Sequence, residues 1–358
     1  MKKFAIKKDT RNDLLTYLAV IVAFVLLTIL STTGVLGRAQ TALLVPVCAY
    51  IVCALGLNLC VGILGELSLG HAGFMSVGCF VGITISEALS SSVPSPTLRL
   101  ILAIIIGAIF AGIIGFLIGI PVLRLKGDYL AIVTLAFGEI IKDIVTCLIV
   151  GVDENGLHII FNATGAKTVN DLGMSASGKT IIAGAQGAVG TETISTFLGG
   201  FILIMIALVI VLNFKRSRTG RAVMAIRDNR IAAEASGLQI TRYKLIAFAL
   251  SAAIAGAAGA LYGLNLSSVV ATKFNFNTSI LILVYVVLGG LGNMRGTLIA
   301  ATVLYVLPEL LRAFSDYRML VYAIVLILVM IGTNNQKVRQ LISKIIPKKK
   351  AKTEGEVK

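Results

Sequence analysis

Charged residues are scarce in this sequence. Asp, Glu, Lys and Arg make up 14% of its 358 residues, against about 25% in a typical soluble domain. There are also only five cysteines and two histidines. The low charge and the high apolar content exclude an ordinary soluble enzyme and a disordered chain, and the few cysteines exclude a disulfide scaffold.

The residues that catalysis or metal binding would need are missing as well. All five cysteines fall within apolar runs and have no zinc or redox spacing, so we interpret them as small hydrophobic residues. The two histidines, His71 and His158, cannot build a metal site between them. Because no Ser/His/Asp set and no pair of apposed carboxylates is apparent, we expect no metal, no cofactor and no enzymatic activity.

Long apolar runs are what the sequence has in abundance. Its hydrophobic fraction is 57% and its mean hydropathy is +0.95. A transmembrane helix needs about 20 mostly apolar residues, so the runs predict an all-α polytopic membrane protein with about ten transmembrane helices. The third run and the last three are short, which is typical of re-entrant or broken segments. The ten runs are Leu14–Leu36, Ala39–Gly65, Leu67–Ser86, Leu100–Leu123, Tyr129–Val150, Thr196–Phe214, Leu245–Asn265, Phe276–Gly292, Gly296–Leu311 and Met319–Gly332.

The basic residues predict the orientation of these spans. With both termini inside, the inside segments hold 24 of the 32 Lys and Arg and have a net charge of +16, while the rest of the chain has −1. We therefore expect a multi-pass protein of the cell (plasma or inner) membrane with cytoplasmic termini. Its parts are a basic segment 1–13, a transmembrane domain 14–332 and a basic tail 333–358. The basic charge indicates contact with membrane lipid and does not require nucleic acid.

One substantial outside segment, about residues 151–195, is rich in Gly, Ser, Thr and Asn and predicts an external loop or small cap. Within it, residues 173–180 match the P-loop pattern GxxxxGK[ST]. A working P-loop follows a hydrophobic strand and opens a helix. Here the preceding residues are polar and the following ones are Gly-rich, so we reject nucleotide binding.

The longest inside loop, about residues 215–244, predicts a short amphipathic helix over Ala222–Ser236. Gly237 suits the left-handed position that ends a helix, and Thr241 is placed to cap the next one. An exposed helix between two spans is a natural docking element for a cytoplasmic partner. The alternative is a basic loop that lies on lipid headgroups.

Polar groups inside the spans are the candidates for a translocation path, because ionisable side chains are costly in a membrane. Glu139 and Lys142 share a helix face, so they are candidates for the path. An ion pair that neutralises itself and has only a structural role is an equal alternative. His71 lies between Gly70 and Gly73, a pattern typical of a helix break that lines a cavity, or of a packed turn. We assign four further glycines to close helix packing: Gly115, Gly119, Gly259 and Gly263.

Several stretches together resemble the LivM-type permease subunit of the branched-chain amino acid ABC importers, and the resemblance extends over about residues 40–335. The sister LivH type carries a different first motif. The stretches are Leu55–Gly62 with Leu67–Phe74, Leu123–Ile140, the 215–244 loop with Thr241–Gly263, and the turn Leu288–Asn293.

The resemblance implies an ABC importer permease fold and a transport subunit without ATP chemistry of its own. It implies a sister LivH-like permease, two ATP-binding subunits and an extracytoplasmic binding protein that delivers leucine, isoleucine or valine. Transport of another small solute (urea, a nucleoside or a sugar) is the first alternative. A secondary transporter is the second, and a membrane enzyme would need a polar cluster that we do not find.

The resemblance also implies a role for the loop as the ATPase-coupling element. Family members carry Glu-Ala-Ala followed four residues later by Gly, and here Ile231 stands in place of the Glu. Glu234, Arg227 or Arg230 is expected to supply the charged contact instead. The outside loop also lacks the usual Pro. The expected coupling residues are Arg221, Arg227, Arg230, Ile231, Ala232, Ala233, Glu234 and Gly237.

Overall fold

A computed structural model shows a helical chain with a small sheet. It describes residues 8–35, 37–90, 92–125, 127–153, 156–162, 169–175, 178–311 and positions 317, 320–321, 323–324 and 327. The chain divides into two units, Met1–Val303 and Leu304–Lys358.

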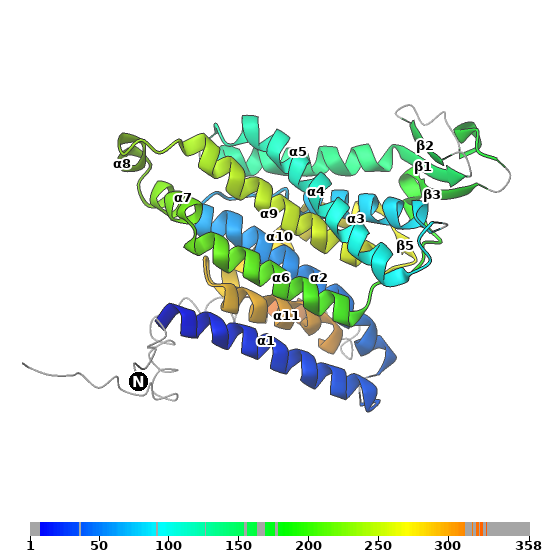
Figure 1. Cartoon of the computed structure of the whole chain (residues 1–358), viewed down its shortest axis with the longest axis horizontal. Helices are drawn as coiled ribbons and strands as arrows, with labels where there is room; N and C mark the ends of the chain where they lie inside the picture. Colours follow the sequence, from blue (N-terminus) through cyan, green and yellow to red (C-terminus); the bar gives the residue numbers. More distant parts are fainter. Residues whose placement is uncertain are drawn as a thin grey trace, which may run out of the picture. The chain divides into compact units, whose positions relative to one another are not determined.

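Nine of the ten predicted spans coincide with helices (Figure 1). The tenth, Met319–Gly332, lies mostly outside the described residues. The helices of the spans are α1 (Lys8–Thr32), α2 (Arg38–Asn58) with the π-helix η1 (Leu59–Leu64), α3 (His71–Ala88), α4 (Pro96–Val122), α5 (Asp128–Thr146), α6 (Phe197–Arg216), α9 (Ile240–Gly263), α10 (Phe276–Gly289) and α11 (Met294–Leu310).

Five helical segments in the described part are long and apolar enough to cross a membrane. They belong to α1, α2 with η1, α4, α6 and α9. The helix α10 is apolar but has only 14 residues. The number of crossings, about ten, therefore stays a prediction.

The core of the unit forms where α9 packs against α2, α3 and α4. Small residues fill this contact, because Ala, Gly and Ser let helix backbones approach closely where hydrophobicity alone provides little attraction between helices. A Cβ at Gly259 would overlap the carbonyl oxygen of Met75 on α3, and one at Gly115 would overlap Ala252 on α9. At Gly119 and Gly263 the nearest atoms are side-chain atoms, Leu245 Cδ1 and Cys79 Sγ, each 2.6 Å from the added Cβ. The packing predicted for these four glycines is confirmed.

The segment predicted as an external loop or small cap, about residues 151–195, contains strands, which corrects the purely helical fold class. Four strands between Leu148 and Val189 and a fifth at Ser268–Val269 form one sheet in the order β2-β1-β3-β4-β5. The antiparallel register of β1 and β2 runs from Leu148↔Phe161 to Asp153↔Gly156. The strands are β1 (Leu148–Asp153), β2 (Gly156–Phe161), β3 (Lys179–Ala183), β4 (Ala188–Val189) and β5 (Ser268–Val269), with short 3₁₀ turns at Val169–Leu172, Gly184–Gln186 and Ala271–Phe274.

The fifth span consequently ends at Thr146, earlier than the predicted Val150. The residues from Leu148 to Val152 are rich in β-branched side chains, which favour extended backbone where partner strands are available. Both β2 and β3 supply those partners.

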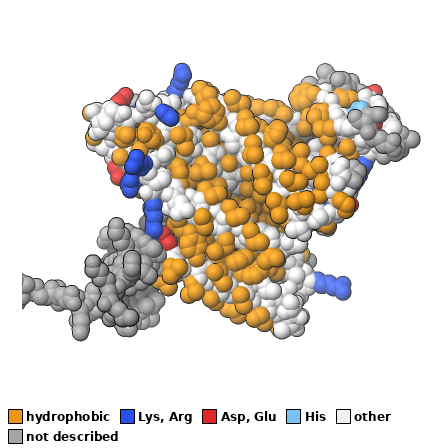
Figure 2. Space-filling view, in the orientation of Figure 1, with side chains coloured by type: hydrophobic (Ala, Val, Ile, Leu, Met, Phe, Trp, Pro, Cys, Tyr) orange, Lys and Arg blue, Asp and Glu red, His pale blue; other side chains and the backbone are white. Residues whose placement is uncertain are grey.

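Ion pairs join the sheet side of the unit to the helices. Lys179 Nζ of β3 lies 2.7 Å from Glu87 Oε2 at the end of α3. Arg99 in the first turn of α4 pairs with Glu192 at 2.7 Å. At the opposite end of the helices, Lys and Arg gather around α7 (Arg218–Asp228) and α8 (Arg230–Ala235), while hydrophobic side chains cover the face between (Figure 2).

Candidate functional site

The predicted loop helix Ala222–Ser236 is in fact two helices, α7 and α8, with a break at Asn229. Asn229 is extended (φ −152°, ψ 104°), and its side-chain oxygen accepts a hydrogen bond from Ala232 N at 3.0 Å. Asn is among the preferred residues for this capping role. The composition predicts helix over this stretch, and the structure adds a cap at Asn229 that divides it in two.

The turn at Gly237 is confirmed. Gly237 has φ +80° and its N–H donates to Glu234 O at 3.0 Å, while Leu238 N–H donates to Ala233 O at 3.2 Å. The predicted Thr241 cap is wrong, because α9 already begins at Ile240. The first backbone hydrogen bond of α9, from Tyr243 N to Gln239 O, places the start of the helix before Thr241.

The two short helices have a hydrophobic core of their own. Ala233 is only 5% exposed and packs with Ile226 and Ile240. In contrast, Ile231 on α8 is 81% exposed. Arg221, Arg230, Ala232 and Glu234 are also exposed. The predicted coupling residues therefore divide into an outward-facing set and Ala233, which faces inward.

Arg227 is engaged within the chain, although part of it is exposed. Its Nη1 donates to the carbonyl oxygen of Gly62 in η1 at 2.6 Å, and its Nη2 lies 3.0 Å from Asp228 Oδ1. A guanidinium that donates to a carbonyl near a helix C-terminus is a favourable arrangement, because those carbonyls lack helical partners. Arg227 thus connects α7 to the end of the second span.

Gly62 also contacts the turn that follows α10. A Cβ at Gly62 would overlap Gly292 N and lie 2.8 Å from Gly292 Cα. Nearby, the buried Asn58 accepts from Gly292 N at 2.8 Å and donates to Thr297 Oγ1 at 2.7 Å. Two of the stretches that carry the family resemblance therefore touch each other. Asn58 and Gly292 are not among the predicted site residues, although both lie within the stretches that carry the resemblance.

The predicted break before His71 is present. Residues 65–70 separate η1 from α3, and Gly65 has φ +81°. The freed amides find side-chain acceptors on other helices: Leu69 N donates to Thr134 Oγ1 at 3.0 Å and Ala72 N to Ser279 Oγ at 3.1 Å. Buried backbone outside a helix needs such partners, because its polar groups have none of their own.

The residues around this break are tightly packed. His71 is 1% exposed and its ring meets Phe74 edge-on. A Cβ at Gly70 would overlap the Thr134 carbonyl oxygen of α5, and one at Gly73 would lie 2.9 Å from Gly138 Cα. The two glycines thus bring the start of α3 against the backbone of α5.

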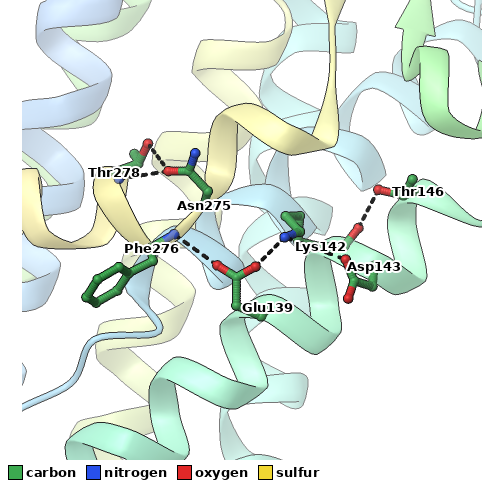
Figure 3. A network of polar contacts seen from close by, with 7 residues as sticks. All are labelled: Glu139, Lys142, Asp143, Thr146, Asn275, Phe276 and Thr278. Atoms are coloured by element: carbon green, nitrogen blue, oxygen red, sulfur yellow. Dashed lines mark hydrogen bonds and ion pairs between the residues drawn. The ribbon is translucent and has the colours of Figure 1, made fainter.

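Glu139 and Lys142 form the predicted pair on one face of α5 (Figure 3). The second carboxylate oxygen of Glu139 accepts from Phe276 N at 3.0 Å, at the N-terminus of α10. A negative charge there is favourable because the helix dipole is positive at that end. Lys142 Nζ also lies 3.6 Å from Asp143 Oδ1. The pair therefore links α5 to α10.

The P-loop-like stretch has the wrong local structure for phosphate binding. Lys179 opens the strand β3, where a P-loop would open a helix. Its ammonium group pairs with Glu87.

The packing and the surface together define the class of this protein. Apolar helices that meet through Gly and Ala, with broad apolar outer faces and basic groups gathered at one end, are features of a multi-pass membrane protein. Comparison with known proteins then gives the particular family.

The chain belongs to the family described as branched-chain amino acid transport system / permease component, whose model matches residues 39–330. It is 34% identical over 288 residues to the high-affinity branched-chain amino acid transport system permease protein LivM of Escherichia coli K12. That match covers 79% of this chain and 66% of the relative, so the chain spans slightly less than two thirds of the LivM length.

The corresponding LivM of Salmonella typhimurium LT2 is 33% identical, with the same coverage of both chains. LivH of the same Salmonella strain is 27% identical over 289 residues, which is 79% of this chain and 88% of LivH. The higher identity to LivM confirms the LivM-type resemblance. No solved structure matches the chain.

Proposed function

We propose that this chain is the membrane-spanning permease subunit of an ATP-driven ABC importer for branched-chain amino acids. The observation that carries the proposal is its 34% identity to a LivM permease over 79% of its length. The chain itself forms the path for the solute, and partner subunits hydrolyse ATP. An extracytoplasmic binding protein delivers leucine, isoleucine or valine, and a LivH-like sister permease completes the membrane part.

The proposed topology has about ten crossings, with segments 1–13 and 333–358 in the cytoplasm. Two contacts support this topology. Each joins segments that are far apart in sequence and that the topology places on the same, inner side. Asp13 pairs with Arg216, and Lys215 Nζ lies 3.4 Å from Gly292 O. The sheet near residues 148–189 is then extracytoplasmic.

The segment between α6 and α9, which contains α7 and α8 and is called the α7–α8 loop here, is the proposed contact with the ATPases. Burying an exposed Ile at an interface is favourable by about 1.5–3 kcal/mol, and Ile231 is 81% exposed on α8. Arg230, Ala232 and Glu234 flank it on the exposed surface. Since Arg227 donates to Gly62, it is less suited than Arg230 or Glu234 to replace the missing family Glu.

The path candidates Gly70, His71, Gly73, Glu139 and Lys142 occupy the contacts of α5 with α3 and α10. A helix that begins within the bundle marks the binding region in many transporters. The start of α3 at His71 has this form. We therefore place the path along this contact region.

The docking proposal is tested with Ile231→Glu, in complexes purified with candidate cytoplasmic ATPase subunits. We expect affinity to fall by at least tenfold and coupled transport to fall with it. Gln239→Glu, which places the same charge on an exposed residue beyond the Gly237 turn, is the matched control. Ala233→Glu is unsuitable because Ala233 belongs to the loop's own core. Full association of Ile231→Glu would contradict the assignment.

The solute is tested by uptake of labelled leucine into vesicles that hold the full complex and its binding protein. Excess isoleucine or valine should compete, whereas urea, a nucleoside or a sugar should not. Competition by one of the latter alone would identify the alternative solute class.

A further inference from the structure

The π-helix η1 is a junction where three distant parts of the chain meet. The α7 helix reaches it through Arg227, and the turn after α10 reaches it through Gly292. The first turns of α9 reach its end through Lys244, which pairs with Glu66. π-Helices are rare, occur mostly as short segments, and are frequently found at functional sites.

Arg227 is fitted closely to the end of η1. Its guanidinium donates to Gly62 O, and its stem covers Gly65, where a Cβ would lie 2.9 Å from Arg227 Cδ. Gly65 also needs to be glycine because its φ is +81°. A charge-assisted bond together with a close steric fit makes this contact between α7 and η1 strong and directional.

The second connection is the ion pair of Lys244 and Glu66. Its side chains are 9% and 14% exposed, so water screens it little. Lys244 lies in the first turns of α9, which follows the α7–α8 loop, and Glu66 is the second residue of the non-helical segment 65–70 that leads to His71. The α7–α8 loop is thus attached to the region that precedes α3 at two points: through Arg227 within the loop and through Lys244 just after it.

We infer that Arg227 and Lys244 are positioning residues that move η1 and segment 65–70 together with the α7–α8 loop. This rests on the proposed function, in which ATPase subunits displace that loop. Energetic coupling between two separate sites, here the α7–α8 loop and the start of α3, is carried by packed elements and polar networks of this kind. The two side chains transmit displacement of the loop to the start of α3, and they contact neither ATP nor the solute.

The first test compares Arg227→Gln with Arg218→Gln, which removes the same charge from an exposed position on the same helix. Each variant is assembled with its ATPases and binding protein in vesicles, and both ATP hydrolysis and leucine uptake are measured. We expect Arg227→Gln to assemble and hydrolyse ATP, with at least a tenfold rise in ATP used per leucine. Arg218→Gln should keep the wild-type ratio. An unchanged ratio for Arg227→Gln, or loss of assembly, would overturn the inference.

The second test is independent of how well Arg227→Gln folds. Glu66→Lys and Lys244→Glu are measured singly and combined. Each single change should raise the ATP-to-leucine ratio or prevent assembly, and the exchanged pair should restore assembly and at least part of the coupling. A doubly exchanged protein that assembles but couples no better than the single variants would refute the role of this pair.

The two proposals fail in distinguishable ways. If the wild-type chain neither binds ATPases nor transports solute, the proposed function is wrong. If it transports and the variants keep its ratio, only the positioning role is wrong.

Discussion

Replacement of Gly259 by Ala is the sharpest test of the packing that holds the helices together. A Cβ there would overlap the carbonyl oxygen of Met75 and lie 2.8 Å from its carbon and 2.9 Å from Cys79 N. These are backbone atoms of α3, which cannot rotate away. The two helices must therefore separate, although carbon atoms attract each other best at about 3.5–4.0 Å.

The expected cost follows from two opposing effects. Overpacking a close contact costs about 1–3 kcal/mol, and backbone obstruction places this site at the upper end. Ala favours a helix interior over Gly by about 1 kcal/mol. The net loss is then about 2 kcal/mol, which lowers the melting temperature by about 3 °C in a chain of this size.

Gly112→Ala is the matched control. It lies in α4 against α9, where a Cβ would be 3.2 Å from the Ala253 methyl group and would require only a small adjustment. The preference of a helix for Ala over Gly then roughly offsets the cost of the tight contact with Ala253. We therefore expect the free energy of unfolding to change by less than about 0.5 kcal/mol.

The cysteines of the chain provide the assay. Cys48, Cys53, Cys60 and Cys79 are free and buried, so a thiol-reactive fluorophore reports unfolding in detergent. The partly exposed Cys147 is first replaced by Ser. If Gly259→Ala melts at the same temperature as Gly112→Ala, the close approach of α3 and α9 is wrong.

Three further outcomes are expected. Gly237→Ala should lower stability by about 1–2 kcal/mol in the same assay, because φ is +80° there, and Gly237→Asn should cost less. A single cysteine at Glu234 should react with an impermeant thiol reagent only after permeabilisation if the loop is cytoplasmic; Ser217 is a poorer site because its hydroxyl caps α7. Lys179→Met should leave ATP labelling of the complex unchanged but speed proteolysis within residues 148–189, because Glu87 loses its cation.

Local chemistry determined much of the fold and of the loop. Apolar runs and the scarcity of charge predicted nine segments that are helical, since a helix satisfies its own backbone without help from the rest of the chain. The left-handed turn at Gly237 followed from the residue type alone. The strand at Leu148–Asp153 was missed because it continues an apolar run, and its pairing depends on β2 and β3.

Contacts between distant residues were decided only by tertiary packing. The sequence placed Ile231 and Ala233 in one motif, but packing against Ile226 and Ile240 buried one and left the other exposed. Arg227 and Gly62 are 165 positions apart, and Lys244 and Glu66 are 178 apart. Hydrophobic periodicity reports which residues avoid water within a single element. It does not report which polar groups meet across elements, because helix crossings decide that.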